Sequence, residues 1–366
     1  MVRDTNRGVK LLNQKRLQRL REKLKEHHLD GYITLKKENR EYLSQFTGTS
    51  GYVVVTENDA VLFTDFRYMS QAKQQTQFFD VIEHESSYAK TIGDWLNEQK
   101  ISRLGFEAAN VSFETYNQWR DQWNAELVGV ADLVAELRTI KDEREIAIIQ
   151  HAVDITDQAF AYLLGIIRPG MSEREVALEL EMQLKKRGAT HLAFDTIVAS
   201  GVRSSMPHGV ASDKLIESGD MVTIDFGAQY EGYCSDMTRT FVVGKANSRQ
   251  KEIYDTVLTA QQRVLDNIKA GMVCKDVDRI ARDYIYQQGY QGCFGHGLGH
   301  ALGMEVHENP RLNQICEVIL EPGMVVTVEP GIYIPEFGGV RIEDDVVIET
   351  SGCKILNKTP KEFLEI

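Results

Sequence analysis

The feature that most constrains the fold is an internal repeat in the last two-thirds of the chain. The segments GMSEREVALELEMQLKKRGA (residues 170–189) and GMVCKDVDRIARDYIYQQGY (residues 271–290) share an opening Gly-Met, an amphipathic helical pattern and a glycine near the end. Each segment is followed by a pair of predicted strands. A period near 100 residues is too long for a solenoid. The repeat therefore predicts two similar halves folded about a pseudo-twofold axis, with a site where they meet.

Paired acidic residues occur in the strand pair of each half. In the first half, MVTIDFGAQYEGYCSDMTRTF predicts a hairpin with a Glu-Gly turn. A hairpin centred between positions 230 and 231 places Asp225 directly opposite Asp236, where like charges are destabilising. In the second half, VVTVEPG supplies Glu329 and VRIEDDV supplies Glu343. Carboxylates gathered among apolar strand residues require a cation, a shared proton or solvent.

The segment CFGHGLGHALGMEVHENP (residues 293–310) contains three of the nine histidines, His296, His300 and His307. It is not the helical zinc motif HExxH, because no glutamate follows the first histidine and two glycines disfavour a helix. A strand or a loop with close backbone approach is expected instead. A single histidine here would more often be structural, but the cluster next to the acidic pairs makes His300 and His307 stronger site candidates than His296.

Together, the four acids and His300 form an oxygen-rich set of metal ligands. Such a set suits Mn(II), Co(II), Fe(II) or Zn(II). Two divalent ions balance four carboxylates, whereas one leaves two negative charges uncompensated. Two metal ions roughly 3.5–4 Å apart, bridged by carboxylates and a hydroxide, form a known hydrolytic arrangement. We therefore expect two divalent cations per chain, with Mn(II) as the first choice.

Composition excludes several other classes of protein. The chain has 366 residues, 42% of them hydrophobic, which predicts one or two domains with packed cores. A formal charge of -12 argues against nucleic-acid binding. Five cysteines without a CxxC pair argue against a disulfide framework or a thiolate zinc site and fit a reducing cytoplasm. The basic N-terminus has no apolar core of a secretory signal, and no apolar run is long enough to span a membrane.

The first third of the chain alternates predicted strands and helices, as in an α/β domain. A helix is expected over residues 11–28, followed by strands in LDGYITL and in SGYVVVTENDAVLFT, the latter turning at Asn-Asp. Further strands are expected in QTQFFDVIEH and SRLGFEA, with a helix around KTIGDWLNEQK between them. A long helical pattern begins near residue 138. We therefore predict one domain over residues 1–137 and a second over residues 138–366.

Several motifs in residues 138–366 resemble the pita-bread metallopeptidases, which include methionine aminopeptidase, aminopeptidase P, prolidase and the metal-free creatinase. The motifs are FDTIVASGVRSSMPHG, DFG with SDMTRT, HGLGHALGMEVHE, VEPG and GVRIEDD. In residues 1–137, NREYLSQFTGTSGYVVV and LFTDFRY resemble the creatinase-like N-terminal domain of the proline-specific branch, which methionine aminopeptidases lack. The resemblance implies an α/β N-terminal domain followed by an α+β pita-bread domain.

The resemblance also implies a role for each site residue. Asp225 would chelate one metal, Asp236 and Glu343 would bridge both, and His300 and Glu329 would bind the other. His208 and His307 would contact the substrate at the scissile carbonyl, and Glu329 would move the proton of the attacking hydroxide. His296 and Arg341 would line the substrate side, with Arg341 either anchoring a carboxylate or positioning Glu343. Thr238 would hydrogen-bond a ligand rather than bind metal.

The implied activity is hydrolysis of the Xaa-Pro bond at a peptide's N-terminus, in a family whose members are commonly homodimers. The modest length favours a prolidase-like dipeptidase over aminopeptidase P, which acts on longer peptides. A non-catalytic binding module on the same fold is the remaining alternative. Such a protein would usually have lost metal ligands, and this chain retains all five.

Overall fold

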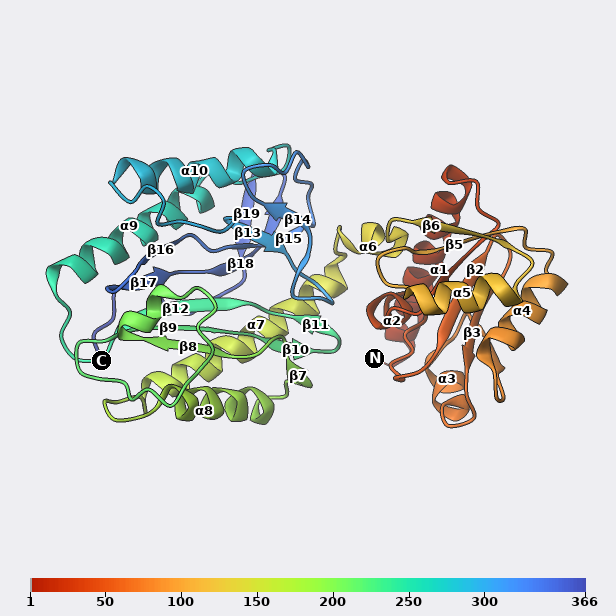
Figure 1. Cartoon of the computed structure of the whole chain (residues 1–366), viewed down its shortest axis with the longest axis horizontal. Coiled ribbons are helices and arrows are strands. Elements are labelled where there is room, and N and C mark those ends of the chain that lie inside the picture. Colours follow the sequence, from red (N-terminus) through yellow and green to blue (C-terminus); the bar gives the residue numbers. More distant parts are fainter. Residues whose placement is uncertain (1) are drawn as a thin grey trace. The chain divides into compact units, whose positions relative to one another are not determined.

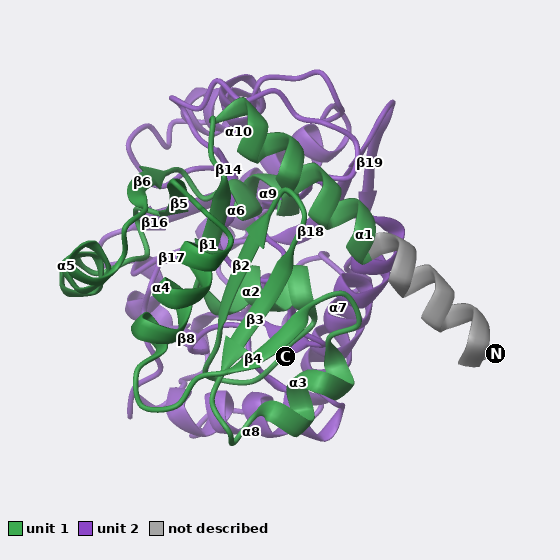
Figure 2. Cartoon of the chain, turned by 90° about the vertical axis from the view of Figure 1, so that its right-hand side faces the viewer, with its two compact units in different colours: residues 1–138 green, residues 139–366 purple. Residues whose placement is uncertain are grey.

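The computed structural model describes residues 2–366, with side chains from Asn13 onward. The chain divides into two compact units, residues 1–138 and residues 139–366, which are coloured separately in Figure 2. Figure 1 labels the helices and strands of both units. None of the helices within residues 2–366 combines the length and apolar character needed to cross a bilayer.

Unit 1 contains a six-stranded mixed sheet in the order β4-β3-β2-β1-β5-β6. The pairs β1–β2 and β2–β3 are antiparallel, and the others are parallel. The predicted strands and helices are all present, whereas β6 and four short helices were not predicted. The strands are β1 (Gly31–Thr34), β2 (Tyr52–Thr56), β3 (Ala60–Thr64), β4 (Asp80–Glu83), β5 (Arg103–Glu107) and β6 (Glu126–Val130). The helices are α1 (Val2–Glu26), α2 (Lys37–Ser44), α3 (Met69–Gln75), α4 (Tyr88–Glu98), α5 (Phe113–Gln122) and α6 (Leu133–Arg138).

The central strands of unit 1 are apolar on both faces. Ile33 and Val54 pack in one hydrophobic cluster with Trp119 of α5, whereas α1 and α2 contact β2. Strands that are buried on both faces form continuous apolar runs such as YVVVT, without an alternation of polar residues.

Unit 2 has two pairs of contacting helices, α7 with α8 and α9 with α10. Figure 1 shows α9 and α10 above the strands of this unit and α8 below them. The first three begin with capping boxes, in which the side chains at the N-cap and the N3 position each bond the other's backbone N–H. The helices are α7 (Glu143–Leu164), α8 (Glu173–Lys186), α9 (Ser248–Leu265) and α10 (Cys274–Gln287).

The strands of unit 2 form four sheets, in the orders β11-β10-β7, β12-β9-β8, β14-β13-β15-β18-β19 and β16-β17. In the first half the strands are β7 (His191–Leu192), β8 (Ile197–Ser200), β9 (Met221–Phe226), β10 (Ala228–Tyr230), β11 (Tyr233–Cys234) and β12 (Met237–Val242). In the second half they are β13 (Gly299–Ala301), β14 (Glu308–Leu312), β15 (Val325–Val328), β16 (Gly331–Ile334), β17 (Gly338–Arg341), β18 (Asp344–Glu349) and β19 (Gly352–Ile355).

Backbone hydrogen bonds repeat between the two halves of unit 2. Gly170 N donates to Ile216 O over 2.9 Å, and Gly271 N donates to Leu320 O over 2.8 Å. In each half, the bond joins the first residue of the repeated segment to a residue that lies beyond the helix of that segment. The two similar halves predicted from the sequence are therefore confirmed.

The predicted pairing of Asp225 with Asp236 is wrong. Asp225 of β9 lies opposite Thr238 of β12, and Tyr230 lies opposite Tyr233. The predicted Glu-Gly turn at residues 231–232 is present, but the strands pair symmetrically about that turn and not about residues 230 and 231. Both turn residues have positive φ, 45° and 82°, as a two-residue hairpin turn of type I′ requires, and glycine suits the second position.

Candidate metal centre

A cavity of about 520 Å³ in unit 2 contains the predicted site. It is lined by Asp225, Asp236, His300, Glu329 and Glu343, the five predicted metal ligands. The four predicted substrate contacts, His208, His296, His307 and Arg341, line the same cavity. Thr238 lies behind it, fully buried. The structure therefore brings all ten residues together from segments as much as 135 positions apart in the sequence.

Both halves of unit 2 contribute to this cavity. Asp225 is on β9, and Asp236 directly precedes β12. His300 is on β13, Glu329 directly follows β15, and Glu343 lies between β17 and β18. Although the hairpin register differs from the prediction, positions 225 and 236 are diagonal neighbours across it, which still brings both carboxylates to the cavity.

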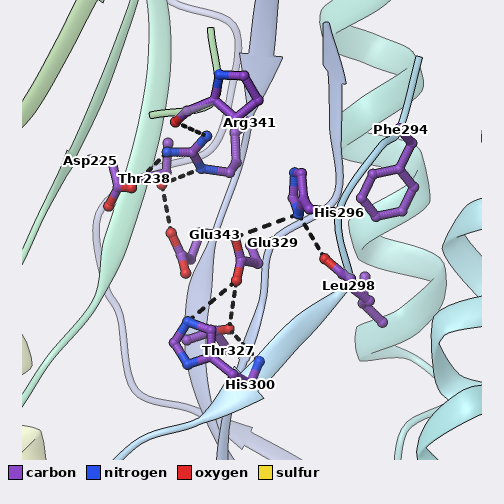
Figure 3. Close-up of polar contacts among 12 residues, drawn as sticks. Asp225, Thr238, Phe294, His296, Leu298, His300, Thr327, Glu329, Arg341 and Glu343 are labelled. Atoms are coloured by element: carbon purple, nitrogen blue, oxygen red, sulfur yellow. Dashed lines mark hydrogen bonds and ion pairs between the residues drawn. The ribbon is translucent and has the colours of Figure 1, made fainter. Parts of the chain in front are cut away.

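Three of the predicted ligands form the tightest group. Asp236, His300 and Glu343 offer ligand atoms that all lie within 4.8 Å of one another. His300 Nε2 is 3.6 Å from Asp236 Oδ2 and 3.4 Å from Glu329 Oε1. Figure 3 shows the side chains of His300 and Glu329 pointing toward each other, with Thr327 next to His300. The Thr327 hydroxyl accepts from His300 N over 3.1 Å and donates to Glu329 Oε1 over 3.2 Å, which fixes both residues.

Burial sets the protonation of this group in the absence of cations. It raises the pKa of Asp236 and Glu343 well above their ordinary values, and neighbouring carboxylates raise them further. It also raises the pKa of Glu329 to about 8. Burial and the nearby His307 lower the pKa of His300 to about 3, so its imidazole is neutral and can bind a metal.

The donor set fits divalent cations. Without them, several buried acids must hold protons, and Asp225 Oδ1 is buried with no hydrogen-bond partner. Cations in the cavity would let these carboxylates ionise and would occupy the unpaired oxygen. Mostly carboxylate ligation with one neutral imidazole suits hard or borderline divalent ions.

Arg341 connects two of the acids through its guanidinium. Nη2 donates to Asp225 Oδ2 over 2.6 Å, and Nε donates to Thr238 Oγ1 over 2.9 Å. The Thr238 hydroxyl in turn donates to Glu343 Oε2 over 2.5 Å. Figure 3 shows Arg341 beside Asp225 and Thr238, with Glu343 next to Thr238. Of the two roles expected for Arg341, this geometry supports positioning the acids rather than anchoring a substrate.

Tyr333, which sequence analysis did not single out, joins Arg341 to His296. Its hydroxyl accepts from Arg341 Nη1 over 2.7 Å and lies 3.0 Å from His296 Nε2. His296 Nδ1 lies 2.7 Å from Gly297 O, an acceptor, so Nδ1 carries the proton and Nε2 accepts from Tyr333. The register of the β16–β17 hairpin, which pairs Gly331 with Arg341, was the signal that could have found Tyr333.

Arg311 is a second cavity residue that sequence analysis missed. It lies on β14, directly opposite His300 in the sheet, and its side chain is exposed. Among the described residues, no carboxylate lies within ion-pair distance of its guanidinium. The cavity therefore offers an unpaired positive charge near His300 and His307.

The fold and the site together define a pita-bread metallopeptidase with an α/β N-terminal domain. Two family models match the chain: the Creatinase/Prolidase N-terminal domain over residues 16–140, and Metallopeptidase family M24 over residues 147–350. The chain belongs to metallopeptidase family M24. The resemblance drawn from the motifs is confirmed.

Several relatives and solved structures are similar over nearly the whole chain. The Xaa-Pro dipeptidase of Pyrococcus furiosus is 42% identical, covering 95% of this chain and 99% of the relative. The solved structure of an Xaa-Pro dipeptidase from Bacillus anthracis matches with a TM-score of 0.96 and 45% identity, covering 97% and 100% of the two chains. An X-Pro aminopeptidase from Thermotoga maritima matches with a TM-score of 0.89 and 40% identity, covering 93% and 98%.

Proposed function

We propose that this protein is an Xaa-Pro dipeptidase that hydrolyses the bond before a C-terminal proline. The observation that carries the proposal is the cavity itself, in which five candidate metal ligands, three histidines and an unpaired Arg311 surround one space. Dipeptidases from two genera, 42% and 45% identical over nearly full length, support the same assignment.

The proposed metal ligands are Asp225, Asp236, His300, Glu329 and Glu343. Together they would hold two divalent cations, with Mn(II) proposed first because carboxylates dominate the set, and Co(II), Zn(II) or Fe(II) as alternatives. When bound, the cations would polarise the scissile carbonyl and acidify a water molecule.

Glu329, His307 and His208 would each act on a different part of the substrate or the attacking water. Glu329, whose pKa burial raises to about 8, takes the proton of the attacking water and returns it to the proline nitrogen as that nitrogen leaves. The leaving nitrogen needs this proton because it would otherwise depart as a strongly basic anion when the C–N bond breaks. Burial lowers the pKa of His307, so the imidazole is neutral at pH 7 and donates one hydrogen bond to the developing oxyanion. His208 orients the substrate from the opposite loop.

Arg311 provides a reason for preferring dipeptides. In an Xaa-Pro dipeptide, the free carboxylate follows the scissile bond by one residue and would form a charge-assisted pair with the guanidinium. In a longer peptide that position holds an uncharged amide. The alternative, an aminopeptidase acting on longer peptides, is favoured by the likeness to the Thermotoga maritima enzyme.

Substrate comparison tests the proposal. The Mn(II)-loaded protein is assayed with Ala-Pro, Ala-Pro-amide and Ala-Pro-Ala, three substrates that share the scissile bond. We expect kcat/KM for Ala-Pro to exceed the other two at least tenfold. Equal turnover of Ala-Pro-Ala would assign the aminopeptidase activity instead, and no turnover of any of the three would refute both.

We further propose a homodimer in a reducing compartment such as the cytoplasm. The dimer rests on the family resemblance, and the compartment on five free thiols. Sedimentation of the full chain measures the first, and a mass near 83 kDa, twice the 41.5 kDa chain, is the expected result.

A further inference from the structure

The loop of residues 200–212 brings His208 to the cavity. It leaves the end of β8, passes through a short 3-10 helix (Gly201–Ser205), and contributes Pro207, His208 and Val210 to the cavity wall. The imidazole of His208 is exposed and makes no hydrogen bond to any residue that the structure describes. Its position therefore depends on how the backbone of the loop is held.

Both ends of this loop bind one buried carboxylate, that of Glu173 in the first turn of α8. The side chain of Glu173 has no exposure to solvent. Oε1 accepts from Ser200 N over 2.8 Å and from Ser200 Oγ over 2.8 Å. Oε2 accepts from Ser212 N over 3.1 Å and from Ser212 Oγ over 2.6 Å. The two residues that open and close the loop are thus joined through a single side chain.

The same carboxylate also reaches the middle of the loop through Arg203. Arg203 Nη1 donates to Glu173 Oε2, and Arg203 Nη2 donates to Val210 O over 2.8 Å. Val210 is two residues beyond His208. Five donors from the loop therefore converge on a charged group that is removed from water, an arrangement that gives short and directional hydrogen bonds.

The second half of unit 2 shows whether the start of the helix needs a carboxylate in order to pack. Glu173 N bonds Lys214 O over 3.0 Å, and at the same place in the second half Cys274 N bonds Val318 O over 2.9 Å. The second half thus makes the same helix-to-chain contact with an uncharged side chain. The carboxylate of Glu173 is therefore not required for this contact, and its hydrogen bonds go to loop 200–212 instead.

We infer that Glu173 is a positioning residue that fixes loop 200–212 so that His208 faces the substrate. The role of His208 in this inference rests on the proposed function. The conformation of the loop does not. Glu173→Gln keeps the size of the side chain, removes its charge and turns one acceptor into a donor that faces other donors. The loop should then be released while the helix stays in place.

Hydrogen exchange tests the state of the loop without reference to activity. In Glu173→Gln, with and without Mn(II), we expect the amides of residues 201–212 to exchange at least tenfold faster, and those of residues 313–320 to be unchanged. Cys274→Ser, at the equivalent position, should leave residues 201–212 unchanged. Unchanged exchange in residues 201–212 of Glu173→Gln, or faster exchange throughout unit 2, would overturn the inference.

Ser212→Ala removes only one of the donors to Glu173. It should raise the exchange rate of residues 201–212 at least threefold, and an unchanged rate would also overturn the inference.

A double-mutant comparison then tests whether Glu173 acts through His208. Glu173→Gln should lower kcat/KM for Ala-Pro at least tenfold in the wild-type background, and less than threefold in the His208→Ala background. Equal factors in both backgrounds would overturn the link to His208. Turnover of Ala-Pro by the wild type is measured first. Its absence would refute the proposed function and would leave the exchange result as a separate outcome.

Discussion

Arg341 Nη2 lies 2.6 Å from Asp225 Oδ2, and this contact joins the two halves of unit 2 at the centre of the site. Asp225 belongs to the first half and Arg341 to the second. The guanidinium is buried, and nearby Tyr333 and the acids hold its pKa well above the ordinary value despite the burial, so its charge is permanent. Arg341 thus orients the acids and limits their mutual repulsion.

Replacing Arg341 tests this orientation. Arg341→Lys keeps a positive charge but cannot bond Asp225, Thr238 and Tyr333 at once, because an ammonium lacks the planar fork. We expect metal affinity and kcat to fall by about 10–100-fold, the range typical of residues that orient metal ligands. Calorimetric titration with Mn(II) and steady-state kinetics provide the measurements. Wild-type values for both quantities would contradict this role.

Removing one hydroxyl tests the bridge between Arg341 and His296. Tyr333→Phe keeps the ring and deletes the hydroxyl that contacts both residues. We expect a tenfold or greater loss of kcat, with Mn(II) content and melting temperature close to the wild type. Tyr162→Phe, on α7 away from the cavity lining, is the matched control and should change none of these values.

His300 is predicted to bind metal directly. In His300→Ala, a neutral buried ligand is lost and two acids that lie within 3.6 Å of it lose a partner. Both the Mn(II) content and the activity should fall, the content by about one ion per chain. Metal analysis by inductively coupled plasma mass spectrometry, after dialysis against a fixed free Mn(II) concentration, measures the change. Full content with full activity would remove His300 from the ligand set.

The metal-free protein should lose stability as pH rises from about 6.5 to 8. In this interval Glu329, with its pKa raised to about 8, keeps its proton in the folded state and loses it in the unfolded state. The folded state then binds more protons, so the free energy of unfolding falls with pH, by about 2 kcal/mol for one carboxyl over 1.5 pH units. Histidines with lowered pKa, such as His300, act in the opposite direction only below about pH 6.5.

Thermal unfolding at several pH values checks this sign. The Mn(II)-loaded protein should show little of the trend, because bound cations keep the acids ionised in the folded state. Mn(II) binding to the metal-free protein at pH 7 should also release protons, which calorimetry in buffers of different ionisation enthalpy detects. A metal-free protein that gains stability from pH 6.5 to 8 would show that the acids are already ionised.

Arg311 is predicted to determine the preference for dipeptides. Arg311→Gln removes the charge and keeps a polar side chain of similar length. We expect KM for Ala-Pro to rise at least tenfold and KM for Ala-Pro-amide to stay within twofold, since the amide has no charge for Arg311 to pair with. A parallel rise for both substrates would show that Arg311 shapes the cavity without recognising the carboxylate.

Residue types and spacing were enough to predict which residues gather at the cavity, but they did not predict how the strands around it pair. The acids, His300 and the repeat are visible because few other contexts place such residues among apolar strands. The facing of Asp225 and Asp236 was wrong because the pairing was centred one residue before the Glu-Gly turn, whose two positive φ angles place Asp225 opposite Thr238. Tyr333 and Arg311 were missed because the register of two short local strand pairs, β16 with β17 and β14 with β13, decides which side chains reach the cavity, and that register was not predicted.

The central claim is that five side chains from two similar halves hold a pair of divalent cations. Anomalous scattering from crystals of the Mn(II)-loaded protein measures this directly. We predict two peaks roughly 3.5–4 Å apart, both within bonding distance of Asp236 and Glu343, with Asp225 on one and His300 and Glu329 on the other. No peak among these five residues, in crystals that retain the fold, would contradict the account.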